Sequence, residues 1–160
     1  MRTTSFFILI VALLLLAGCG GDPSRPADLP KLYPVSITIT QEGNPVEGAT
    51  VTLVSKTPTK YGTSAGSTDS SGIAGFRTYG FDGVPEGEYA VMVDKMVEEG
   101  AREITTSTGD THMTRGKTYR YVEPKYLREA QTPLGISVTT QGAKETFDVG
   151  APVRIFVSTD

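Results

Sequence analysis

The sequence predicts an all-β protein folded as an antiparallel sandwich. The first indication is strict alternation, in which Val35, Ile37 and Ile39 are separated by Ser and Thr side chains, as in a strand with one buried face. The second is that no stretch of ten or more residues beyond the N-terminal segment has apolar side chains at helical spacing. The third is the recurrence of turn residues at intervals of about 8 to 12 residues, which is typical of sandwiches.

The first two strands are expected to form a hairpin. Strand 35–40 is followed by the turn residues Gly43-Asn44-Pro45 and then by alternating Ala49, Val51 and Leu53. A polar loop is expected from Lys56 to Ser67.

Two further turns precede the next strands. In Thr68-Asp69-Ser70-Ser71-Gly72 the Asp and Ser side chains can accept hydrogen bonds from backbone amides, and Gly72 can take positive φ. Ala74 and Phe76 then share one strand face. The turn Gly83-Val84-Pro85-Glu86-Gly87 leads into the alternating Tyr89, Val91 and Val93.

Later strands are expected over residues 119–122, 134–140, 146–149 and 153–158. Residues 94–118 are polar and give no clear assignment. Within them Glu98, Glu99 and Glu103, beside Lys95 and Arg102, could form one charged and solvated helical turn.

The N-terminus has the layout of a secretory signal. Arg2 precedes an apolar run from Phe6 to Ala17, which is shorter than the roughly 20 residues that span a bilayer. Leu16-Ala17-Gly18-Cys19 resembles the lipobox of bacterial lipoproteins, which implies cleavage before Cys19 and attachment of acyl chains such as palmitate to that residue. An ordinary cleaved signal or an uncleaved membrane stub is the alternative. Gly20 after the cysteine is compatible with an outer-membrane destination.

The chain divides into three parts on this interpretation: a signal peptide (1–18), a lipidated Cys19 with a proline-rich tether (19–34), and a β-sandwich domain (35–160). The proline spacing favours an extended tether of about 3.1 Å per residue, with a reach of roughly 40 Å. Removing the signal leaves 142 residues with 14 Lys and Arg against 18 Asp and Glu. This acidic balance gives no reason to expect a nucleic-acid partner, and the lone cysteine excludes an internal disulfide.

Three motifs in order resemble the carboxypeptidase regulatory-like family, also grouped with transthyretin-like domains. They are the segments 43–53, 67–76 and 85–91, with a glycine-proline turn, a Thr-Asp-x-x-Gly turn before an aromatic strand, and a Gly-x-Tyr strand entry. The tail with Pro124-Lys125-Tyr126 is similar to small lipoproteins of that group. The resemblance implies a seven-stranded antiparallel immunoglobulin-like sandwich, an extracytoplasmic setting and no catalysis.

Residues with catalytic or metal-binding chemistry are few. His112 is the only histidine, and no activated nucleophile or second histidine accompanies it, so a solvated loop is its expected place. Asp69, Asp82, Glu86 and Glu88 lie near turns without a calcium-loop pattern, and Asp69 is expected to cap its own turn. No cofactor and no metal are expected.

Aromatic and basic residues interleave between Lys117 and Arg128. The predicted binding patch comprises Tyr119, Arg120, Tyr121, Lys125 and Tyr126. Tyrosine and arginine are enriched at contacts, but Tyr119 and Tyr121 share a strand face and could equally belong to the core.

The sequence therefore predicts a non-enzymatic lipoprotein of the bacterial cell envelope, anchored to the membrane by lipid. Its sandwich would present the loops 56–67 and 94–116 to an envelope protein. A carbohydrate-binding module is the alternative, which requires exposed aromatic rings, and an envelope hydrolase is the least favoured.

Overall fold

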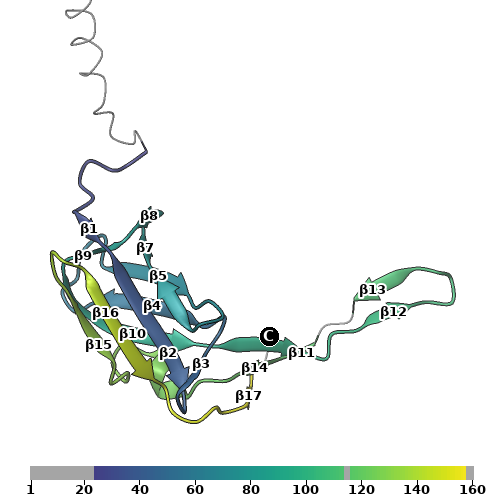
Figure 1. Cartoon of the computed structure of the whole chain (residues 1–160). Coiled ribbons are helices and arrows are strands. Elements are labelled where there is room, and N and C mark those ends of the chain that lie inside the picture. The colour runs from purple at the N-terminus through teal and green to yellow at the C-terminus, as the bar shows by residue number, and fades with distance from the viewer. Residues whose placement is uncertain (1–23, 114–115, 158–160) are drawn as a thin grey trace, which may run out of the picture.

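The structure is a computed structural model that describes residues 24–113 and 116–157. Two β-sheets pack face to face, and a long arm leaves one end of them (Figure 1). The larger sheet contains six strands in the order β15 (Gly135–Val138), β10 (Gly87–Asp94), β4 (Thr50–Ser55), β5 (Thr63–Ser67), β7 (Arg77–Thr78) and β8 (Phe81–Asp82). The second sheet contains β16 (Ala143–Asp148), β2 (Val35–Gln41), β3 (Asn44–Pro45) and β6 (Ile73–Gly75).

The core lies between the two sheets and confirms the sandwich. Ile37 and Ile39 of β2 face Leu53 of β4 and Val91 and Val93 of β10, and all five are fully buried. These are the alternating positions of the sequence, and the intervening side chains, such as Thr38 in β2, Thr52 in β4 and Met92 in β10, lie on the outer faces. Seven strands of the two sheets have three or more residues: β2, β4, β5, β6, β10, β15 and β16.

Two expectations about strand pairing were wrong. β2 and β4 are not a hairpin, because β2 pairs with β3, β6 and β16, whereas β4 pairs with β5 and β10 in the opposite sheet. The sandwich is also not wholly antiparallel, since β16 runs parallel to β2. Alternation specifies which side chains are buried, but either sheet of a sandwich buries them equally well.

Thr68 stabilises the segment between β3 and β4, where the chain passes from one sheet to the other. Its buried hydroxyl donates to the carbonyl of Val46 at 2.6 Å and accepts from the amide of Ala49 at 2.7 Å. The turn that follows is as predicted: Asp69 accepts from the amides of Ser71 and Ile73, and Gly72 has φ +74°.

The predicted loop 56–67 ends in a strand, because Thr63–Ser67 forms β5 against β4. The sequence did not predict this strand, because Ser64, Ala65, Gly66 and Ser67 are small residues that are not typical of strands. Gly66 is required there by a close approach, since a Cβ on it would lie 2.1 Å from the carbonyl oxygen of Gly75.

The tether is shorter than the sequence suggested. Leu29 is buried, and β1 (Leu32–Tyr33) pairs with β9 (Val84–Pro85). Asp28 accepts hydrogen bonds from Lys60 and Tyr61, both at 2.7 Å. The segment from Asp28 onward therefore belongs to the folded domain, and the reach estimated for a free tether up to residue 34 was too long.

Candidate functional site

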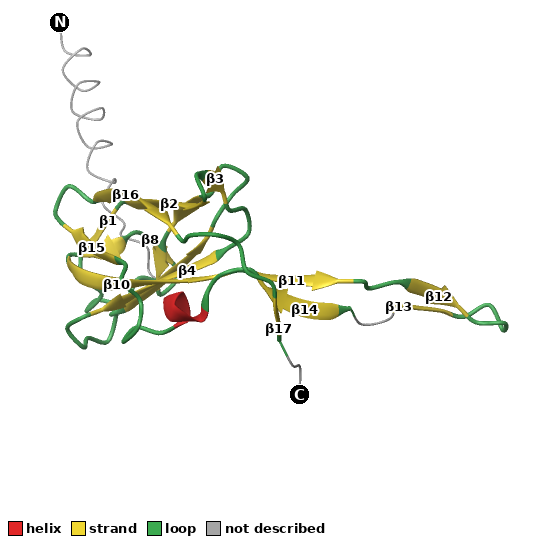
Figure 2. Cartoon of the chain, turned by 90° about the horizontal axis from the view of Figure 1, so that it is seen from below, coloured by secondary structure: helices red, strands yellow, loops and turns green. Residues whose placement is uncertain are grey.

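The arm is built from the region that the sequence left unassigned. It comprises β11 (Met96–Glu99), β14 (Lys117–Arg120) and β17 (Ile155–Phe156) at its root, and the hairpin of β12 (Glu103–Thr105) and β13 (Thr111–Met113) beyond. β11 continues the direction of β10 out of the sandwich, as Figures 1 and 2 show. The expected helical turn at residues 98–103 was wrong, because Glu98 and Glu99 pair in the β11 ladder, Glu103 pairs in the β12 ladder, and residues 100–102 connect the two strands.

Part of the predicted patch lies on this arm. Tyr119 and Arg120 belong to β14, and Tyr121 follows them directly. Lys125 and Tyr126 instead lie in a short 3₁₀ helix, Pro124–Leu127, drawn red in Figure 2. Tyr126 is buried in the core and cannot contact a ligand, which corrects its place in the patch. Lys125 pairs with Glu123 at 2.8 Å.

One face of the arm root carries aromatic side chains. Val97, Tyr119 and Phe156 lie side by side across the three strands. The rings of Tyr119 and Phe156 meet edge to face with centroids 5.8 Å apart, a favourable aromatic geometry. Phe156 nevertheless remains 57% exposed.

A charged cluster completes the same face. The Arg154 guanidinium lies 3.6 Å from the centroid of the Tyr119 ring and donates to Glu99 at 2.7 Å. The Tyr121 hydroxyl donates to the other oxygen of Glu99. Arg154 first, and Tyr121 second, lower the pKa of Glu99 below its ordinary value. The same hydrogen bond to Glu99 raises the pKa of Tyr121, so the phenol keeps its proton and the carboxylate its charge.

The opposite face of the arm root is held by Arg120. Its guanidinium donates twice to Asp94, at 2.8 and 3.2 Å, in a bidentate pair that is about three-quarters buried. This pairing raises the pKa of Arg120. Met96 and Ile155 share that face with Arg120 and remain exposed. Arg120 is therefore held in place by Asp94 and has a structural role in the arm root.

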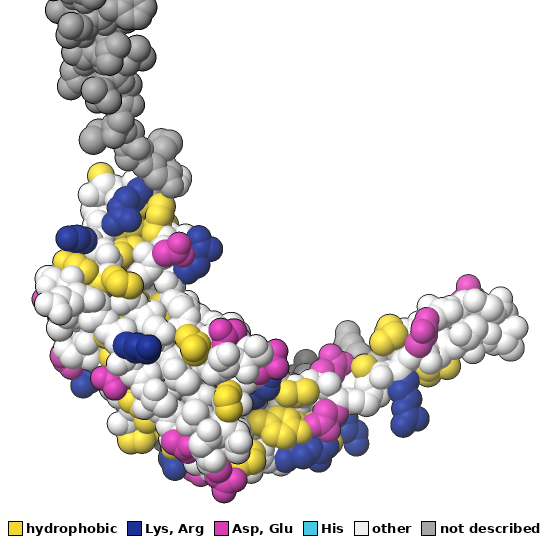
Figure 3. Space-filling view, viewed as in Figure 1, with side chains coloured by type: hydrophobic (Ala, Val, Ile, Leu, Met, Phe, Trp, Pro, Cys, Tyr) yellow, Lys and Arg dark blue, Asp and Glu magenta, His cyan; other side chains and the backbone are white. Residues whose placement is uncertain are grey.

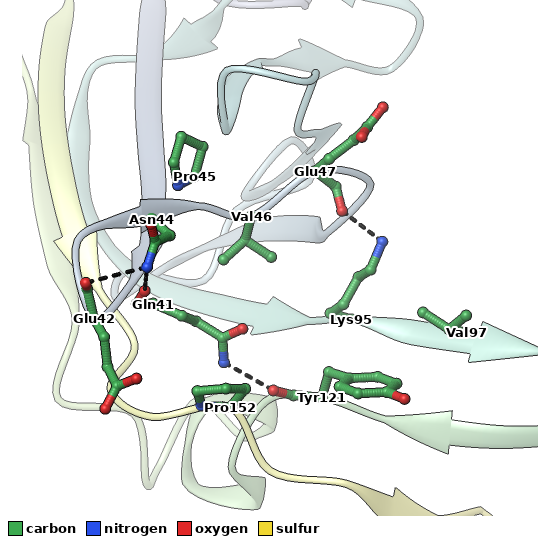
Figure 4. A pocket seen from close by; sticks show the side chains of 10 residues that line it. All are labelled: Gln41, Glu42, Asn44, Pro45, Val46, Glu47, Lys95, Val97, Tyr121 and Pro152. Carbon is green, nitrogen blue, oxygen red and sulfur yellow. Dashed lines mark hydrogen bonds between the residues drawn. The ribbon is translucent and has the colours of Figure 1, made fainter.

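A groove of about 430 Å³ separates the arm from the β2–β3 turn. Figure 4 shows Val97, Lys95 and Tyr121 on its arm side, opposite Pro45 and Val46. Gln41 donates to the Tyr121 carbonyl at 2.8 Å, and Lys95 donates to the Glu47 carbonyl. These two contacts fix the arm root to the end of β2 and to the loop between β3 and β4.

The distal hairpin lacks a hydrophobic core. Every residue of β12 and β13 is exposed, including Ile104 at 49% and Met113 at 68%. His112 pairs with Ile104 across the ladder and is exposed, as the sequence predicted for a solvated histidine. Isolated two-stranded hairpins are marginal in water, so this element depends on the root or on a partner.

Sequence reasoning missed the residues of the arm that lie far apart in the chain. Ile155 and Phe156 form the last described strand and Arg154 precedes it, yet they lie beside Tyr119 and Arg120 of β14. The alternation within 153–158 indicated a strand but not its neighbour. Among the described residues, no cluster of three or more His, Cys, Asp or Glu side chains could hold a metal ion.

The predicted lipid attachment site, Cys19, lies outside the described residues. Within the parts that are described, 24–113 and 116–157, no helix has the length and apolarity to cross a membrane.

No family model and no curated protein sequence matches this chain. Among solved structures, the major pilin subunit of Bacillus cereus is similar at 16% identity and a TM-score of 0.40, over 75% of this chain and 30% of that one. An adhesin from Bacteroides ovatus is similar at 14% identity and a TM-score of 0.39, over 88% of this chain and 50% of that one. The chain thus spans half or less of the length of these proteins.

Proposed function

We propose that the protein is a non-enzymatic bacterial lipoprotein whose sandwich displays the arm to a protein partner in the cell envelope. The lipid anchor is inferred from the motif Leu16-Ala17-Gly18-Cys19. Two or three acyl chains at Cys19 would hold the chain stably at a membrane. The resemblance to carboxypeptidase regulatory-like domains, which rarely carry catalysis themselves, is part of the same proposal.

The exposed apolar surface of the arm is the observation that carries the proposal. Met96, Ile155 and Phe156 at the root and Ile104 and Met113 on the hairpin are exposed by 37% to 68%. They lie on both faces of the arm, with Phe156 on one face of the root and Met96 and Ile155 on the other, and the distal strands have no core to bury Ile104 or Met113. Hydrophobic side chains are visible along the arm in Figure 3. Exposed apolar side chains with polar neighbours on a projecting element are typical of protein contact surfaces.

The edge of the arm sheet supports a protein partner. β11 is the outer strand of the order β11-β14-β17, and no described strand pairs with its other side. An extended segment of another protein can add to such an edge through backbone hydrogen bonds, with specificity from the side chains on either face.

The tyrosines of the arm favour a protein over a glycan. Stacking on a sugar needs an open ring face, but the Tyr119 ring is covered by Arg154 and flanked by Phe156. Tyr126 is buried, and the Tyr121 hydroxyl is held by Glu99. On the arm, the carbohydrate-binding alternative therefore keeps only the exposed ring of Phe156 among the described residues.

Photo-crosslinking in intact envelopes tests the proposal. A benzophenone amino acid is placed at Phe156 or Met113 of the full-length protein, and at Ile73 as the control, because Ile73 is an exposed apolar residue of the sandwich. We expect one adduct of constant mass, sensitive to protease, from both arm positions and none from Ile73. Phe156→Ser should reduce the yield of the adduct at Met113 by about tenfold, as expected for an interface residue that contributes about 1 to 2 kcal/mol to the binding free energy.

Adducts of equal yield at all three positions, or none at the arm, would overturn the proposed contact. An adduct sensitive to glycosidases but not proteases would establish the glycan alternative. Cys19→Ser is the test of the anchor: we expect loss of incorporated acyl label and release of the protein from the membrane fraction.

A further inference from the structure

The tip of the β7–β8 hairpin lies where the described chain begins. Ser24 lines a hollow together with Tyr79 and Phe81, and the Arg25 guanidinium is 5.5 Å from the centroid of the Phe81 ring. In Figure 1 this hairpin stands at the end of the sandwich where the described chain begins, opposite the end from which β11 leaves.

Chain length places this tip close to Cys19. Only four residues separate Cys19 from Ser24 in the sequence. Five residue steps span at most about 18 Å when fully extended. The polar layer on each side of a bilayer is about 5 to 8 Å deep. A lipid on Cys19 would therefore keep the tip within reach of the headgroups.

Tyr79 occupies a backbone position that tyrosine disfavours. Tyr79 and Gly80 are the two loop residues between the paired Thr78 and Phe81, with φ of +51° and +89°. This geometry suits a type I′ turn, where Asn-Gly is preferred. A bulky residue at positive φ carries a strain of about 1 to 2 kcal/mol. Such strain at an exposed position points to a use for the ring.

The ring itself is presented to solvent. Tyr79 is 70% exposed, and its ring meets the Tyr61 ring edge to face with centroids 5.6 Å apart. Tyr79 lines the hollow with Phe81 and Arg77, and the Arg25 guanidinium lies over the Phe81 ring. Figure 3 shows basic and hydrophobic side chains gathered at this end. Aromatic and basic side chains together are characteristic of membrane–water interfaces.

Charge favours a neutral bilayer surface. Arg77 pairs with Asp82 at 3.1 Å, and Lys60 pairs with Asp28 at 2.7 Å. The local charges are thus largely compensated, so the contact depends on the aromatic rings and needs no excess of anionic lipid.

We propose that the β7–β8 tip is a membrane-contact site in which Tyr79 inserts into the headgroup layer beside the lipidated N-terminus. This contact rests on the proposed anchor at Cys19 and adds an orientation to it. With the tip at the bilayer, the sandwich stands on the end opposite the root of the arm, and the arm extends to one side of it (Figure 1).

Single-tryptophan fluorescence tests the contact, because the chain contains no tryptophan. The full-length acylated Tyr79→Trp variant is reconstituted in phosphatidylcholine vesicles with and without brominated acyl chains. Glu42→Trp is the matched control, since Glu42 and Gly43 form a turn of the same backbone type, with φ +49° and +80°, at the far end of β2.

We expect the Tyr79→Trp emission to shift to shorter wavelength and to lose roughly half its intensity with brominated lipid, as an interfacial indole does. The Glu42→Trp emission should keep the wavelength of an exposed indole and show no quenching. Equal behaviour of the two variants, on vesicles that carry the protein, would overturn the membrane contact while leaving the anchor in place.

Failure of the anchor has a different signature. If the acylated protein does not float with vesicles, the proposed function fails before the contact is tested. Cys19→Ser in the Tyr79→Trp background should abolish both flotation and quenching, because one aromatic tip binds a bilayer too weakly alone.

Tyr79→Asn gives a second measurement that does not depend on an introduced indole. Asn fits the turn and should keep the fold, while removing the ring. We expect normal flotation but a faster cleavage of the segment around Arg25 by the nonspecific protease proteinase K on vesicles, by about threefold or more, because the tip no longer shields it. An unchanged cleavage rate would contradict the proposal.

Discussion

The sandwich and the root of the arm are both sheets, yet they are stabilised differently. In the sandwich, the ladders of β2, β4 and β10 enclose Ile37, Leu53 and Val91, which have no exposed surface. In the arm, the ladders of β11, β14 and β17 carry exposed Met96, Ile155 and Phe156. Backbone hydrogen bonds are alike in both, so the difference lies in apolar burial, which is the main favourable term in folding.

The comparison shows how one chain can combine a rigid scaffold with an adaptable surface. The sandwich needs no partner because its core is closed between two sheets. The arm root is secured by ion pairs, Arg120 with Asp94 and Arg154 with Glu99, and by one aromatic contact. The Arg154–Glu99 pair is partly exposed and such pairs contribute little, and the distal hairpin has no buried side chain. The outer part of the arm is therefore expected to open locally while the sandwich stays folded.

The largest effect should come from the core of the sandwich. Leu53→Ala removes a fully buried side chain between the sheets and is expected to lower the free energy of unfolding by about 2 to 5 kcal/mol. Ile104→Ala, in the distal hairpin, should change it by less than about 0.5 kcal/mol. Urea unfolding followed by circular dichroism measures both, and comparable losses would refute the distinction between the two regions.

Two glycines with nearly the same φ give an intermediate effect. Gly142, at φ +86° between β15 and β16, would place a Cβ 2.1 Å from the Pro34 carbonyl oxygen, whereas Gly109, at φ +88° in the hairpin turn, has nothing within 4 Å. Gly142→Ala should cost more than about 2 kcal/mol, because a backbone clash adds to the strain of positive φ.

Gly109→Ala should introduce only the strain of positive φ, about 1 to 2 kcal/mol. This loss of stability should be confined to the arm. Hydrogen exchange should be faster for the amides of β12 and β13 in this variant and unchanged for those of β4 and β10. A shift of the global unfolding midpoint as large as that of Gly142→Ala would mean that the arm and the sandwich unfold as one unit.

The smallest effect should be the response of the arm root to pH. The pKa of Glu99 is lowered in the folded arm by Arg154 and Tyr121, so its contribution to stability is present above the unfolded pKa and is lost as the pH falls through the folded pKa. We expect the NMR signals of Phe156 and Tyr119 to shift between about pH 5 and pH 3. Glu99→Gln should remove this step, and 0.5 M salt should weaken it, because the pair is exposed. Identical titrations of the two proteins would exclude the cluster as their source.

Much of the sandwich could be predicted from local patterns. Alternation at Val35, Ile37 and Ile39 and at Tyr89, Val91 and Val93 located buried side chains correctly, because the strand period of two is a local property. The Asp69 turn was also local, since its hydrogen bonds stay within four residues. Three of the five patch residues, Tyr119, Arg120 and Tyr121, do lie on or next to an arm strand, but their neighbours Arg154 and Phe156 come from more than 30 residues away.

The sequence by itself determined that the chain is β-rich, which of its side chains are apolar enough to be buried, and that Cys19 ends an N-terminal signal pattern. Only the tertiary structure decided that β2 and β4 lie in opposite sheets, that β16 runs parallel to β2, and that residues 96–120 leave the sandwich as an arm. The physical reason is that burial along a strand follows the two-residue period, which can be recognised from neighbouring residues in the sequence. The choice of partner strand depends on contacts between distant segments, and many pairings satisfy the same period.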